Sequence, residues 1–90
     1  MNIRIKEEII AWREQSDGNV VIFSPELPYA LYLNEVASVI WKLLVKGETI
    51  ETIAEKLSSI YDVAKSKAKN DILEFIEELK KLEVIEVYEK

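Results

Sequence analysis

The sequence predicts one α+β domain in which a three-stranded antiparallel sheet is followed by three helices. Before residue 34, short apolar segments alternate with turn-forming residues, which is typical of neighbouring strands with short connections. After residue 34, apolar residues recur at intervals of three and four, which is typical of amphipathic helices. With 90 residues, the whole chain, residues 1–90, fits a single domain with a modest core.

The three predicted strands form a meander. Asp17 and Gly18 form a turn signal between the first two strands, and a loop with two prolines precedes the third. In such a meander the third strand lies at an edge of the sheet. The predicted strands cover residues 9–14, 20–23 and 29–33.

The helical half has recognisable start and stop signals. Asn34 and Thr49 are suitable N-caps for the first two helices, and Gly47 is a suitable stop for the first. Trp12 and Trp41 follow the apolar pattern of their segments, so we expect both in the core. The predicted helices cover about residues 35–46, 50–60 and 64–82, with a short last strand at 84–88.

The composition argues against several classes of protein. There is no cysteine and no histidine, which removes disulfides, thiolate metal sites and the commonest general base and metal ligand. The formal net charge of −5 argues against a general nucleic-acid binder. No apolar run reaches the length of a membrane span, and no signal peptide is evident at the N-terminus. We therefore expect a soluble, cytoplasmic protein that binds neither nucleic acid nor membrane.

No catalytic constellation is evident. The only glycines are Gly18 and Gly47, so a glycine-rich phosphate loop is absent. Glu74, Glu77 and Glu78 have the spacing of a solvated helix face rather than of a buried acid–base pair. We expect no catalytic residue, no metal site and no cofactor, and hence a binding module rather than an enzyme.

An ordered set of short motifs resembles the PqqD-like family, the precursor-peptide-binding domains also called RiPP recognition elements. No single motif is specific, but together they extend over about residues 9–86. The motifs are a leucine-rich strand ending in Leu-Asn, an Ala and an Ile on the first helix, a Gly-x-Thr step, a Tyr-Asp step and an Asp-x₃-Phe run, which match Leu31, Leu33, Asn34, Ala37, Ile40, Gly47, Thr49, Tyr61, Asp62, Asp71 and Phe75.

This resemblance implies a winged-helix-turn-helix-like fold and no activity of its own. Members of the family hold the leader segment of a ribosomally synthesised precursor peptide and present it to a modifying enzyme. That enzyme is a radical-SAM maturase, a cyclase or a leader peptidase. The leader is held as an added strand on the third strand of the sheet, beside the third helix.

The residues themselves support a peptide site at the third strand. An edge strand has unpaired N–H and C=O groups, which a peptide strand can satisfy. A second interpretation also stands: Pro25 and Pro28 protect an exposed edge from aggregation. The candidate peptide-binding residues of the strand are Tyr29, Ala30, Leu31, Tyr32 and Leu33.

The predicted core stripe of the third helix is centred near Ala68, Ile72, Phe75 and Leu79, and one flank of this stripe is the second candidate surface. It carries three lysines and two aliphatic residues, and would suit an acidic peptide with apolar anchors. Alternatively, the lysine stems simply cover apolar surface next to the core. The sequence does not determine which flank of this helix faces the strand. The candidate residues of this flank, here called the lysine edge, are Lys65, Lys69, Leu73, Ile76 and Lys80.

Two other functions remain open at this point. Strands followed by three helices also suit a winged-helix DNA-binding regulator, although the acidic net charge opposes it. An exposed edge strand could also pair with that of a second copy, as in a structural subunit. We therefore expect a monomer or a weak homodimer.

Overall fold

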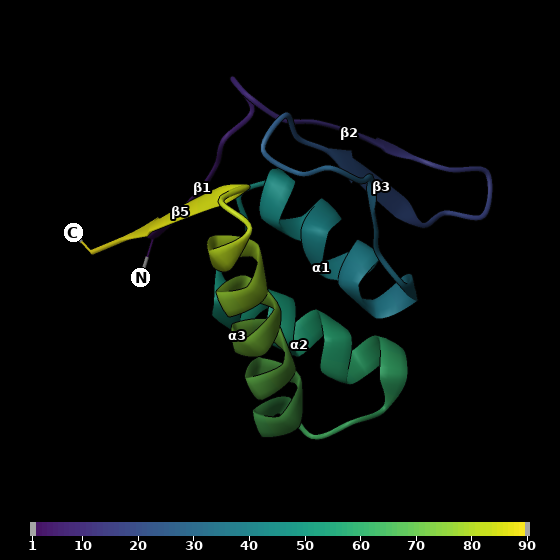
Figure 1. The fold of residues 1–90 in the computed structure, drawn as a ribbon. Helices are drawn as coiled ribbons and strands as arrows, with labels where there is room; N and C mark the ends of the chain where they lie inside the picture. Colours follow the sequence, from purple (N-terminus) through teal and green to yellow (C-terminus); the bar gives the residue numbers. More distant parts are fainter. Residues whose placement is uncertain (1, 90) are drawn as a thin grey trace.

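The computed structural model describes residues 2–89 and shows two small sheets packed around three helices (Figure 1). This confirms the predicted α+β class, with a three-stranded antiparallel sheet followed by three helices. The elements are β1 (Asn2–Ile5), β2 (Ala11–Glu14), β3 (Val20–Phe23), β4 (Leu31–Tyr32), α1 (Glu35–Val45), α2 (Ile50–Tyr61), α3 (Lys65–Lys81) and β5 (Ile85–Tyr88).

The main sheet has the order β2-β3-β4, and both pairings are antiparallel. Two of its strands are shorter than the sequence predicts. The N–H groups of Ile9 and Ile10 both donate to the carbonyl of Lys6, which makes a turn of the segment expected to start the first strand. The strand expected over residues 29–33 is reduced to Leu31–Tyr32.

A second sheet joins the two ends of the described chain. β1 and β5 pair antiparallel, from Asn2 opposite Tyr88 to Ile5 opposite Ile85. β5 confirms the short strand expected at 84–88, whereas β1 is absent from the sequence prediction. Across this pair, Arg4 donates to Glu86 at 3.0 Å.

The helix boundaries follow local chemistry. The Asn34 side chain accepts from the N–H of Ala37 at 2.9 Å, and that of Thr49 accepts from the N–H of Thr52 at 3.1 Å. Both predicted N-caps are therefore confirmed. Gly47 ends the first helix at a φ of +87°, in the left-handed region where a side chain would be strained.

The core lies between the main sheet and the helices. Trp41 is fully buried at its centre, as predicted. Trp12 is only partly buried, and its ring meets that of Trp41 edge-on, with the ring centres 6.2 Å apart. The buried stripe of α3 consists of Ala68, Ile72, Ile76 and Leu79, with Phe75 only partly buried beside it.

Candidate functional site

A buried serine joins the strand-to-helix corner at β4 to its neighbours. Ser38, in α1, is 1% exposed. Its hydroxyl accepts from the N–H of Val20 at 2.8 Å and donates to the carbonyl of Leu33 at 3.3 Å. The N–H of Leu33 in turn donates to the carbonyl of Val20 at 2.9 Å. These bonds tie the end of β4 to both β3 and α1.

The outer edge of β4 is open. Among the strands of residues 2–89, β4 pairs only with β3. Because the N–H of Leu33 points to β3, the alternation of an antiparallel ladder turns the N–H and C=O of Tyr32 away from β3. Tyr32 thus offers both a donor and an acceptor to an incoming strand.

A groove of about 450 Å³ lies beside this edge, between β4, the start of α1 and α3. We call it the β4–α3 groove. Most of its lining from β4 and α1 is apolar, and α3 contributes one aromatic ring and three carboxylates. It is lined by Leu31, Tyr32, Leu33, Asn34, Val36, Ala37, Ile40, Asp71, Glu74, Phe75 and Glu78.

The α3 wall of this groove is acidic. Asp71 accepts from Lys67, one helical turn before it, at 3.1 Å. Glu74 and Glu78 are exposed, and neither carboxylate forms a hydrogen bond or ion pair with another residue of the described chain. Among residues 2–89, no lysine or arginine lines the groove. The wall therefore keeps a negative potential facing β4.

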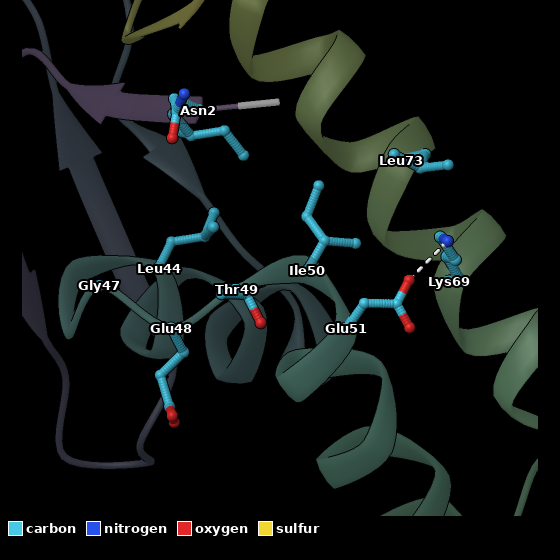
Figure 2. Close-up of a pocket in the computed structure, with 10 residues that line it drawn as sticks. Asn2, Leu44, Gly47, Glu48, Thr49, Ile50, Glu51, Lys69 and Leu73 are labelled. Atoms are coloured by element: carbon cyan, nitrogen blue, oxygen red, sulfur yellow. Dashed lines mark hydrogen bonds and ion pairs between the residues drawn. The ribbon is translucent and has the colours of Figure 1, made fainter. Parts of the chain in front are cut away.

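Two residues of the lysine edge, Lys69 and Leu73, line a different hollow, of about 480 Å³, between β1, the start of α2 and α3. Figure 2 shows Lys69 and Leu73 of α3 on one side of it and Glu51 and Ile50 of α2 opposite. Lys69 lies 2.6 Å and Lys65 3.4 Å from the carboxylate of Glu51. These two cations, Lys69 foremost, lower the pKa of Glu51.

The structure therefore separates the two halves of the predicted peptide site. Leu31, Tyr32 and Leu33 line the β4–α3 groove, and Tyr32 is 67% exposed. Tyr29 and Ala30 precede β4 and do not line the groove. Lys69 and Leu73 instead line the hollow by α2, and Ile76, 3% exposed, belongs to the core. A binding role for the lysine edge stays a prediction, but that edge does not line the groove beside β4.

Sequence reasoning missed the groove residues of α3. It assigned Phe75 to the core and the glutamates to a solvated face. The apolar spacing of α3 fits a stripe centred on either Phe75 or Ile76, and only the packing of α3 against α2 decides between them. With the stripe centred on Ile76, Phe75 and the carboxylates turn towards β4.

Other kinds of site find no support in the part of the chain that the structure describes. Residues 2–89 contain no group of three acidic side chains placed to hold a metal ion. None of the described helices is long and apolar enough to cross a membrane.

Three solved structures are similar over nearly the whole chain. TbiB1 in complex with the TbiA(beta) leader peptide has a TM-score of 0.85 and 25% identity, covering 97% of this chain and 99% of that one. A lasso peptide synthetase B1 complexed with the leader peptide has a TM-score of 0.84, covering 97% and 100%, and at 24% identity it supports the fold alone.

The third structure is the PqqD truncation of Methylobacterium extorquens PqqCD, described as a functional and stand-alone RiPP recognition element. Its TM-score is 0.75 and its identity 26%, covering 94% of this chain and 88% of that one. No curated protein sequence matches the chain.

The family model named coenzyme PQQ synthesis protein D, or PqqD, matches residues 19–85. The match runs from the start of the central strand β3 through all three helices into β5, so it includes both the open edge of β4 and the whole of α3. The chain therefore belongs to the PqqD family.

Proposed function

We propose that this protein binds the leader segment of a ribosomally synthesised precursor peptide as an added strand on β4, and presents the peptide to a modifying enzyme. The observation that carries the proposal is the open edge of β4 beside the β4–α3 groove. The leader peptide bound by the similar TbiB1 structure supports the same function.

The geometry suits recognition of an extended peptide. The outward N–H and C=O of Tyr32 supply main-chain hydrogen bonds that do not depend on the peptide's sequence. Alternate side chains of the added strand point into the groove, where Leu31 and Phe75 offer apolar contacts. Affinity thus comes from the backbone, and selectivity comes from the groove.

The protein acts in this proposal as an adaptor without catalysis of its own. The partner enzyme is a radical-SAM maturase, a cyclase or a leader peptidase, and binding holds the precursor close to that enzyme. The DNA-binding alternative finds no support in the similar structures, one of which is a complex with a leader peptide and another a RiPP recognition element.

A backbone substitution tests the proposal directly. Tyr32→Pro removes the outward N–H and leaves the bonds between β3 and β4 in place, whereas Tyr32→Ala removes the ring and keeps the N–H. A fluorescently labelled leader from a precursor gene beside this one is titrated against both variants and wild type. We expect wild type to bind in the micromolar range or tighter, and Tyr32→Pro to bind about ten-fold more weakly than Tyr32→Ala.

Two results would contradict the proposal. One is equal binding by Tyr32→Pro and Tyr32→Ala, with both variants folded by circular dichroism. The other is the absence of binding by wild type to any neighbouring leader. If sedimentation then showed a mass that rises with protein concentration, pairing of the edge strand with that of a second copy would replace leader binding as the proposed function.

A further inference from the structure

The β4–α3 groove has an uneven charge distribution. Its α3 wall carries Asp71, Glu74 and Glu78, while no cationic side chain of residues 2–89 lines any of its walls. Of these three carboxylates, Asp71 is paired, with Lys67 of the same helix. The unpartnered charge is therefore concentrated at Glu74 and Glu78.

This pair differs from two other carboxylates that face another element, each of which has a cationic partner. Glu14 meets Lys42 of α1 at 3.1 Å, and Glu51 meets Lys69 of α3. Glu74 and Glu78, by contrast, are four residues apart on one helix face, where like charges repel each other. A cation placed between them would remove this repulsion.

The spacing matches an extended peptide. Four residues of helix advance about 6 Å along the axis, and alternate residues of a strand advance about 6.6 Å. A strand running along the groove would therefore bring one or two of its groove-facing positions opposite Glu74 and Glu78. The apolar lining at Leu31 and Phe75 would cover the methylene stem of a long side chain, while its charged head reaches the carboxylates.

We infer that the peptide segment bound in this groove carries lysine or arginine at one or two alternate positions that face α3. This inference rests on the proposed function and adds the charge of the ligand. The inferred ligand charge is opposite to the acidic charge that the lysine edge suggests. Lys65 and Lys69 of that edge lie on the α2 side of α3 and have Glu51 as their counter-ion.

The test is selection from a displayed library of random 12-residue peptides. The groove variant is Glu74→Gln/Glu78→Gln. The control variant is Glu55→Gln/Glu77→Gln, which changes two exposed glutamates outside the groove and has the same net charge. We expect peptides selected by wild type and by the control variant to be enriched in lysine or arginine at alternate positions. Those selected by the groove variant should lose this enrichment.

A titration of the best selected peptide measures how much the two groove carboxylates contribute to affinity. We expect the groove variant to bind it about five-fold more weakly than the control variant at low salt, with the difference shrinking as salt rises. Selected peptides without basic residues, or equal losses in both variants, would overturn the inference and leave the proposed function standing. If no peptide were selected and no neighbouring leader bound, the proposed function itself would fall, and the inference with it.

Discussion

The two flanks of α3 have opposite charge and opposite surroundings. The lysine edge faces the start of α2, where Lys65 and Lys69 share the carboxylate of Glu51. The other flank faces β4 across a groove, where Glu74 and Glu78 have no cationic partner among residues 2–89. Two lysines of the flank that the sequence favours as a ligand site thus have an anionic partner within the fold, whereas the two glutamates of the flank that the sequence assigns to solvent have no cationic one.

The difference teaches that a charge indicates a ligand only when the fold leaves it uncompensated. Lysines in the first turns of α3 are unfavourable for the helix dipole, which suggests an external anion. Glu51 supplies that anion from another helix, 18 residues before Lys69 in the chain. Ion pairing within the fold therefore has to be known before a surface charge is assigned to a partner.

The largest expected effect is on stability, and it distinguishes the core face of α3 from the face that lines the groove. Ile76 is 3% exposed, so Ile76→Ala should lower the free energy of unfolding by about 3 kcal/mol, through lost burial and a cavity. Phe75→Ala, in a partly buried side chain, should cost less stability and weaken leader binding more. Urea unfolding by circular dichroism, with a leader titration, measures both. A small stability loss with strong loss of binding for Ile76→Ala would place Ile76 at the ligand after all.

A smaller effect tests whether the lysine edge contacts the peptide. In Lys65→Gln/Lys69→Gln, we expect the leader dissociation constant to stay within about two-fold of wild type, because these lysines lie on the α2 side of α3. Lys46→Gln/Lys81→Gln serves as a control with the same net charge. A clear loss of binding confined to the lysine-edge variant would instead support the acidic ligand.

Local signals predicted much of the fold. Asn34, Thr49 and Gly47 act within one helical turn, so their roles can be read from neighbouring residues. The position of β4 at a sheet edge follows from the order of a meander. The edge position of β4 also locates the part of the candidate site in which main-chain groups bind the peptide.

The parts of the fold and of the site that the sequence did not predict depend on contacts between residues far apart in the chain. β1 pairs with β5 from the other end of the chain, and no neighbouring residue signals this pairing. Phe75 and Ile76 are both apolar and adjacent, so the sequence pattern leaves open which of them faces the core. In the folded protein Ile76 is buried in the core and Phe75 lines the groove, and this rotation of α3 places the carboxylates of Glu74 and Glu78 at the groove.

The smallest expected effect is a pH dependence that differs between the two flanks. Lys69 and Lys65 lower the pKa of Glu51 from the ordinary value of 4.5. A carboxyl whose pKa is lower in the folded protein stabilises it above the ordinary pKa, and this contribution is lost as pH falls through the folded value. Glu51→Gln should therefore lower the urea midpoint slightly at pH 7, with a difference from wild type that shrinks below about pH 4.5.

The groove variant should behave in the opposite way. Removing the repulsion between Glu74 and Glu78 should leave the urea midpoint at pH 7 unchanged or slightly higher. A midpoint lowered as much as in Glu51→Gln would mean that these carboxylates have a cationic partner within the fold. The groove would then have no uncompensated charge to offer a peptide, and the two flanks of α3 would be electrostatically alike.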